Sequence, residues 1–223
     1  MIARDVGHAR QLRVLVITVA AVAVLGAVGF YSSYLRHFPG FEGVGWQVHF
    51  HLLTVLAWIG MLVGQGWLAA TRRLATHRKL GRLSFALVPL VLVGFVLITS
   101  YGQLRHKEPA LLGATFLDAS LFSTLYALAI AHRRNPGLHS RYMMLTPLSF
   151  LNPTLGRAVS PAFSVPFVLA LFVGLFFLAR RKGTPSRPYL VAALVYVGLT
   201  VIVVYVSVAQ PGFLESLWKA LWG

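Results

Sequence analysis

Apolar residues occur along the chain in long blocks that are separated by short polar segments. Blocks of roughly twenty apolar residues match the length that an α-helix needs to cross about 30 Å of hydrocarbon. The pattern predicts seven membrane-spanning helices, at residues 14–34, 46–70, 82–101, 111–131, 142–160, 165–179 and 189–209. We therefore expect an all-α fold, a seven-transmembrane-helix bundle that occupies residues 1–209 as a single domain.

The end of the chain has a different pattern, one apolar face rather than a continuous apolar block. Residues 210–223 contain "PGFLESLWKALWG", in which apolar residues recur at helical spacing: Phe213, Leu214, Leu217, Trp218, Leu221 and Trp222. This segment predicts a short amphipathic helix that lies in the membrane interface, where tryptophan is favoured. We interpret it as a lipid anchor without chemistry of its own.

Charge then orients the helices. The sequence has a formal net charge of +15, but only 11% of its residues are charged, and the lysines and arginines lie almost wholly between the apolar blocks. With a cytoplasmic N-terminus, fifteen of the twenty fall on the inner side, which predicts a periplasmic C-terminus. This distribution indicates a multi-pass protein of the bacterial inner (plasma) membrane, with the lipid bilayer as its partner and no nucleic acid.

Polar residues inside the spans are costly in hydrocarbon and so indicate possible sites. In the second span, His51, Trp58 and Gln65 recur every seven residues and form one stripe that we expect to face the bundle. His49 lies about 160° from His51 around a regular helix. The two histidines could bind one ion only if the helix began after His49.

A second set of polar residues lies in the fourth and fifth spans. Asp118 lies about two turns from the outer end of its helix, and Asn152 and Arg157 lie in the outer half of theirs. Arg157 is a natural partner for Asp118, and His51 has a similar depth. We therefore predict a polar site near the outer face, in which His49, His51 and Asp118 would supply the minimum set of ligands for a metal. A structural ion pair that only fixes helix packing is the alternative.

Two further histidines precede spans on the cytoplasmic side. His77 lies in "LATHRKLGR" and His139 in "NPGLHSRYM", both short basic segments. Facing neutral imidazoles can ligate a metal or a haem iron. They can equally cap helices or contact lipid phosphates beside the neighbouring basic residues.

The second to fifth spans also carry a set of short motifs. An H-x-H helix start, an L-H-R-x-L-G loop, a membrane aspartate and an R-R-x-P-x-x-H-x-R-x-M loop together resemble a widespread bacterial family of polytopic membrane proteins. In this chain the elements fall on His49, His51, His77, Arg78, Gly81, Asp118, Arg133, Pro136, His139, Arg141 and Met143. The resemblance covers about half of the chain and implies a site but no particular reaction.

A weaker resemblance concerns the stretch "HFHLLTVLAW" and the later "HRKLG". These are similar to the dihaem cytochromes b that take electrons from ascorbate, which also use His-led helices followed by a basic loop. This resemblance implies haem b as the cofactor. The histidines of this chain lie near the membrane edges, and no clear pair of axial ligands is present on the outer side.

Three functions remain open. The first is a redox or metal-linked protein that binds haem b or a transition metal through His49, His51, His77 or His139. The second is a proton-coupled small-molecule transporter, with Asp118 as the protonation site and the proline-broken fifth span as the moving element. The third is an assembly or accessory subunit that contacts other subunits of a membrane respiratory complex. Phosphate-binding loops and hydrolase motifs are absent from the sequence, and enzymatic activity is left open.

Overall fold

The structure of the chain is a computed structural model that describes residues 24, 26–31, 34–106 and 110–222. It divides into two compact units, residues 1–94 and residues 95–223, and each unit is described by itself. The first predicted span, residues 14–34, lies largely outside the described residues.

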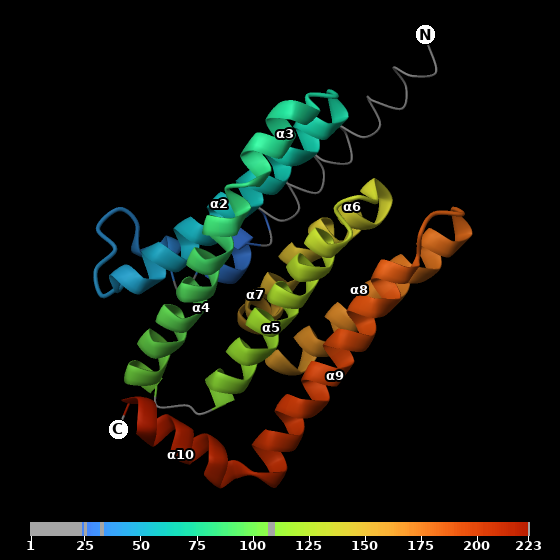
Figure 1. The fold of residues 1–223 in the computed structure, drawn as a ribbon. Coiled ribbons are helices and arrows are strands. Elements are labelled where there is room, and N and C mark those ends of the chain that lie inside the picture. Colours follow the sequence, from blue (N-terminus) through green and yellow to red (C-terminus); the bar gives the residue numbers. More distant parts are fainter. Residues whose placement is uncertain (1–23, 25, 32–33, 107–109, 223) are drawn as a thin grey trace. The chain divides into compact units, whose positions relative to one another are not determined.

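The described residues form helices and no strands, which confirms the all-α class (Figure 1). The α-helices are α2 (Trp46–Ala70), α3 (Leu74–Gly81), α4 (Ser84–His106), α5 (Ala110–Ala131), α6 (Pro136–Leu145), α7 (Leu151–Ala158), α8 (Pro161–Arg181), α9 (Arg187–Ala209) and α10 (Pro211–Trp222). Two 3-10 helices, η1 (Leu35–His37) and η2 (Thr146–Phe150), are also described, and residues 26–30 are helical as well.

Five of these helices are long and apolar enough to cross a membrane: α2, α4, α5, α8 and α9. The chain is therefore a multi-pass membrane protein, but the expected number of seven spans is wrong for the part of the chain that the structure describes. The predicted topology, with the N-terminus inside and the C-terminus outside, stays a prediction.

The predicted span at residues 142–160 is broken into α6, η2 and α7. Its prolines explain where the breaks fall, because proline has no N–H group to donate and is best tolerated in the first turn of a helix. Pro147 is the second residue of η2 and Pro153 the third of α7. The hydroxyls of Thr146 and Ser149 donate to the main-chain carbonyls of Met143 and Thr146. Side chains thus satisfy part of the backbone at the break.

The unit of residues 1–94 contains a hairpin of α2, α3 and the first half of α4. The turn after α2 includes Arg72, which has a positive φ of 58°. Further along, Gly94 lies directly against α2: a Cβ atom there would be 3.0 Å from Thr54 Oγ1 and 3.3 Å from His51 Cα. Glycine therefore allows the two helices to approach at this level.

In the unit of residues 95–223, α5 packs against α6, η2 and α9, while α8 packs against α7 and α9. Their shared apolar core includes Leu121, Leu125, Val168, Phe172, Ala192 and Tyr196. A Cβ atom on Gly113 would lie 2.8 Å from Val203 Cγ1, so α5 and α9 are close there.

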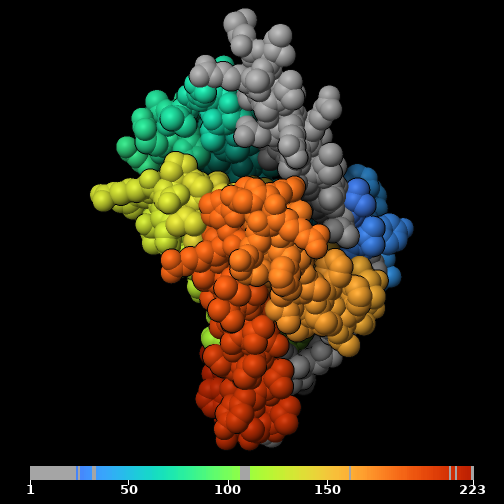
Figure 2. Space-filling model, turned by 90° about the vertical axis from the view of Figure 1, so that its right-hand side faces the viewer, coloured from blue at the N-terminus to red at the C-terminus, as the bar shows by residue number. Residues whose placement is uncertain are grey.

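The outward faces of α8 and α9 are apolar. Figure 2 shows the surface of these two helices on one side of the molecule. Their exposed large side chains include Phe167, Val173, Phe177, Leu194, Val201, Val204 and Tyr205. Apolar side chains of this kind are expected to contact lipid, so the bilayer is a direct partner of this surface.

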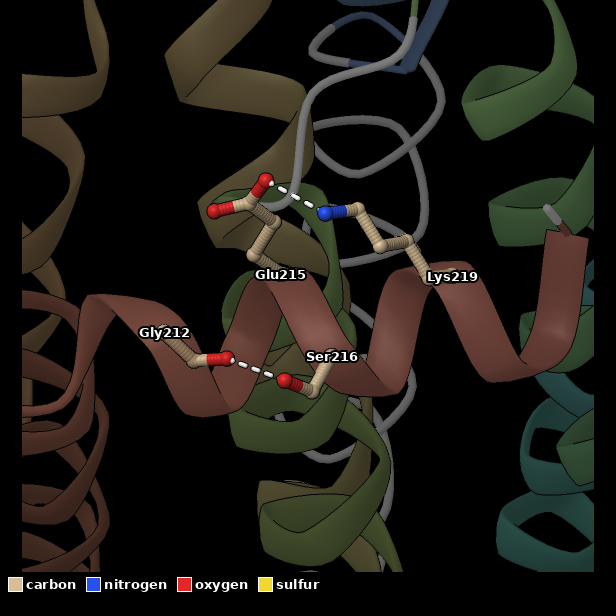
Figure 3. Close-up of polar contacts among 4 residues, drawn as sticks. All are labelled: Gly212, Glu215, Ser216 and Lys219. Atoms are coloured by element: carbon tan, nitrogen blue, oxygen red, sulfur yellow. Dashed lines mark hydrogen bonds and ion pairs between the residues drawn. The ribbon is translucent and has the colours of Figure 1, made fainter.

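The predicted C-terminal helix is present as α10, which directly follows α9. Glu215 and Lys219 form an ion pair at 3.0 Å, and Ser216 Oγ donates to the carbonyl of Gly212 at 2.7 Å (Figure 3). At 100° per residue these four residues share one face. The exposed apolar residues of α10, Phe213, Leu217 and Leu221, fall on another. The amphipathic pattern is confirmed, and its interfacial position stays a prediction.

Candidate functional site

The candidate site of unit 95–223 is a chain of hydrogen bonds among three buried side chains. Asp118 lies on α5, Asn152 on α7 and Tyr196 on α9. Asn152 Nδ2 donates to Asp118 Oδ1 at 2.9 Å, and Tyr196 Oη donates to Asn152 Oδ1 at 2.8 Å. The three residues are only 4%, 8% and 1% exposed. Three separate helices therefore meet at one polar position inside an apolar bundle.

Both hydrogen bonds point toward the carboxyl group. The tyrosine hydroxyl donates to the amide, and the amide donates to the carboxyl oxygen of Asp118. Donors arranged in this order stabilise negative charge on the oxygen that accepts. An ionised carboxylate in apolar surroundings remains costly, so the site can hold either a charge or a proton at this atom.

The broken segment brings Asn152 to the site. Because α7 begins at Leu151, Asn152 lies in its first turn, next to the junction with η2. Phe150, the last residue of η2, stacks on Phe95 and packs against Phe122, at ring-centroid distances of 5.8 and 5.6 Å. This aromatic cluster holds the junction against α4 and α5 within the unit.

The sequence analysis placed Asp118 and Asn152 in one site but missed Tyr196. The signal that could have identified it is a tyrosine in the middle of a mostly apolar span, "YLVAALVYVGLTVIVV". A buried tyrosine hydroxyl usually has a hydrogen-bond partner, so Tyr196 could have been matched to a polar residue of similar depth. Its ring also lies 5.8 Å from that of Phe172, centroid to centroid.

Arg157 lies on α7, five residues after Asn152, and its side chain is exposed. Its Nη1 donates to the main-chain carbonyl of Pro153 at 3.2 Å. The hydrogen bond that reaches Asp118 comes from Asn152. The ion pair of Asp118 with Arg157 stays a prediction.

The two histidines of the H-x-H start lie in the other unit and have different surroundings. His49 Nδ1 is hydrogen-bonded to Tyr34 Oη at 2.8 Å, and its ring packs edge-on against Phe41. His51 lies half-buried against Gly94. Because α2 begins at Trp46, both are part of one helix, and the condition for their convergence on one ion is not met.

His77 and His139 each tie a short helix to the long helix that precedes it. His77 Nδ1 donates to the main-chain carbonyl of Gln65 at 3.2 Å, and His139 Nδ1 donates to that of Ala129 at 2.8 Å. A carbonyl oxygen can only accept, so in the neutral ring the proton is on Nδ1 and the lone pair is on Nε2. The predicted meeting of His77 with His139 involves both units and stays a prediction.

No group of three or more His, Asp or Glu side chains that could hold a metal ion occurs within the described part of the chain. The sequence has no cysteine. The metal set of His49, His51 and Asp118 requires the two histidines to converge, and the continuous helix α2 does not meet that condition. The binding of haem b stays a prediction.

The three residues of the predicted stripe of α2 differ in burial, and His51 is half-buried. Trp58 is fully buried, and Gln65 is 7% exposed. Neither side-chain amide atom of Gln65 has a hydrogen-bond partner in the described residues.

These features define a polytopic membrane protein with a buried polar site, whose described residues are all-α and include five candidate spans. Comparisons with models of known families, with curated proteins and with solved structures find no match to this chain. The functional proposal therefore rests on the geometry of this buried polar site.

Proposed function

We propose that the protein is a proton-coupled membrane carrier of a small molecule, and that Asp118 is the group that binds the proton. The observation that carries this proposal is the buried carboxyl group of α5, hydrogen-bonded through Asn152 to Tyr196 of α9. Ionisable groups inside membrane spans commonly take part in proton relays and substrate pathways.

The hydrogen-bonded chain has two arrangements. With Asp118 ionised, Tyr196 donates to Asn152, which donates to the carboxylate. When Asp118 takes up a proton, its hydroxyl becomes a donor. If the amide of Asn152 turns over, it accepts from Asp118 and donates to Tyr196, whose hydroxyl also accepts. Protonation of one residue thus changes hydrogen bonds on three helices.

The broken segment of α6, η2 and α7 is the part of this unit that can change conformation when Asp118 takes up a proton. Discontinuous helices at the membrane midplane form the binding sites of many secondary transporters. Asn152 also lies next to a break between helices, since α7 follows η2 directly. A change in the Asp118–Asn152 hydrogen bond therefore acts on the junction between η2 and α7.

The experiment uses the absence of cysteine from the sequence. A single Val159→Cys substitution places a reporter thiol at the exposed C-terminal end of α7. In liposomes, we expect the alkylation rate of this thiol to change with pH by more than the ionisation of the thiol itself explains. The same reporter at Val208, an exposed position on α9, supplies the reference.

The proposal requires Asp118 for this pH response. Asp118→Asn should make the ratio of the two alkylation rates independent of pH, while Glu215→Gln, which alters an exposed carboxyl group of α10, should leave the response unchanged. A pH response that persists in Asp118→Asn would overturn the proposal. Substrates can then be sought as compounds that dissipate a pH gradient across proteoliposomes of the unsubstituted protein but not of Asp118→Asn.

A second candidate function, a haem-linked redox role, rests on the histidine geometry. Histidines that ligate metals usually donate their other ring N–H to a carbonyl or carboxylate, and His77 and His139 both donate from Nδ1 to a main-chain carbonyl. Nε2 of each would be the ligating atom. An optical spectrum of protein expressed with added haem tests this role. We expect a Soret band that His77→Ala or His139→Ala removes and His37→Ala retains; a spectrum without the band would exclude it.

A further inference from the structure

Gln65 is a buried amide without a hydrogen-bond partner in the described residues. It lies on α2 within the unit of residues 1–94, and both Nε2 and Oε1 lack a partner there. Burying a polar group without a partner costs on the order of 1–3 kcal/mol. Gln65 is only 7% exposed, so the lack of partners for its amide requires an explanation. A bound ligand that forms hydrogen bonds with both Nε2 and Oε1 is one such explanation.

The contacts around Gln65 place the amide between α2 and α3. Its main-chain carbonyl accepts from His77 of α3. A Cβ atom at Gly81, the last residue of α3, would lie 3.4 Å from Gln65 Nε2. The amide therefore lies against a main-chain position of α3 that carries no side chain.

The position of Gln65 along α2 indicates the kind of ligand. Gln65 precedes the end of the helix at Ala70 by five residues, about 7–8 Å. The basic residues Arg72 and Arg73 lie two and three residues after this end. The same stripe of α2 contains Trp58, Leu62 and Leu68, all buried and apolar apart from the indole N–H. Gln65 therefore lies near one end of the span, and the largely apolar side chains of Leu62 and Trp58 separate it from Thr54, the next buried polar residue of this face.

We propose that Gln65 binds the hydroxyl head group of a lipid-soluble ligand between α2 and α3. A hydroxyl group can donate to Oε1 and accept from Nε2, so one group satisfies both atoms. The apolar remainder of the ligand lies along the hydrocarbon region. Phenolic quinols and glycerolipids both carry such a hydroxyl, and they are the two possible sources of this chemistry.

The experiment measures the melting temperature of the purified full-length protein during titration with three probes of equal alkyl chain length. These are an alkyl hydroquinone, a monoacylglycerol and an alkylbenzene without hydroxyl groups. We expect a saturable rise in melting temperature with the hydroquinone or with the monoacylglycerol, because a ligand that binds only the folded state stabilises it. The alkylbenzene should have no such effect. The probe that binds identifies the source of the hydroxyl.

Two variants and one control connect this binding to Gln65. Gln65→Leu should weaken binding about tenfold, as expected for the loss of the hydrogen bonds to the hydroxyl. Gly81→Ala leaves the amide intact but places a methyl group beside it, and it should also weaken binding. The matched control is Gln103→Leu, which replaces a fully buried glutamine of α4 in the other unit and should bind as the unsubstituted protein does.

Three results would overturn the proposal. The first is no saturable effect of either hydroxyl probe on the unsubstituted protein. The second is an alkylbenzene effect equal to that of the hydroxyl probes, which would indicate apolar partition alone. The third is unchanged binding in both Gln65→Leu and Gly81→Ala, which would indicate that a water molecule satisfies the amide. These results do not depend on Asp118, so the carrier proposal is tested separately.

Discussion

Replacing Tyr196 by phenylalanine removes one hydroxyl from the buried polar chain and leaves the ring in its contact with Phe172. The substitution deletes the hydrogen bond to Asn152 Oδ1 and leaves that oxygen without its donor. Hydrogen bonds between membrane helices contribute about 0.6 kcal/mol on average and up to about 1.7 kcal/mol. Because Asn152 is only 8% exposed, we expect a cost of about 1 kcal/mol in the free energy of unfolding.

A double-mutant cycle isolates the contribution of this hydrogen bond. Asn152→Leu removes the partner of both Tyr196 and Asp118, and we expect it to cost about 2 kcal/mol. In that background the tyrosine hydroxyl has already lost its acceptor, so Tyr196→Phe should have a cost near zero. The coupling energy between the two positions should therefore be about 1 kcal/mol.

Reversible unfolding in mixed micelles of increasing SDS content measures all four free energies. Tyr205→Phe serves as the control because Tyr205 lies on the same helix, α9, with an exposed side chain. It should change stability by less than about 0.5 kcal/mol. An equal cost of Tyr196→Phe in both backgrounds would show that the hydroxyl stabilises the protein independently of Asn152, and the reasoning above would then be wrong.

Three further substitutions test the packing and the C-terminal helix. Gly94→Ala should lower stability by about 1–3 kcal/mol, because its Cβ atom would lie 3.3 Å from the Cα atom of His51; an unchanged melting temperature would contradict this. Gly113→Ala should be destabilising by a similar amount, and Val203→Ala should restore part of the loss, since the new Cβ atom would lie 2.8 Å from Val203 Cγ1. Lys219→Ala should change the free energy of unfolding by less than about 0.5 kcal/mol, because both members of its ion pair are more than 60% exposed; a larger loss would indicate a contact beyond that pair.

The long helices could be predicted from the sequence because length and apolar character are enough to define a span. The predicted range 46–70 coincides with α2, and 111–131 differs from α5 by one residue. The prediction of one continuous span at residues 142–160 is wrong, because a hydropathy pattern does not show that the two prolines lie in the first turns of new helices. The breaks at Pro147 and Pro153 depend on hydroxyl groups and on aromatic packing that are only brought together in the folded unit.

The candidate site could be predicted only in part, for a geometric reason. Counting residues along a helix gives the depth of a side chain, and depth was enough to group Asp118 with Asn152. The direction in which each side chain points depends on the rotation of each helix, which the sequence pattern does not determine when a helix is apolar on all sides. The contact of Asn152 with Tyr196 therefore required the structure.

The break in the segment of residues 136–158 also has a consequence for biosynthesis. Its helices α6, η2 and α7 have ten, five and eight residues, so none alone spans the hydrocarbon core. Its buried Asn152 is hydrogen-bonded to two neighbouring helices of the same unit, through Asp118 of α5 and Tyr196 of α9. We expect the translocation machinery to release this segment into lipid only together with the helices before and after it, as a late step of membrane integration.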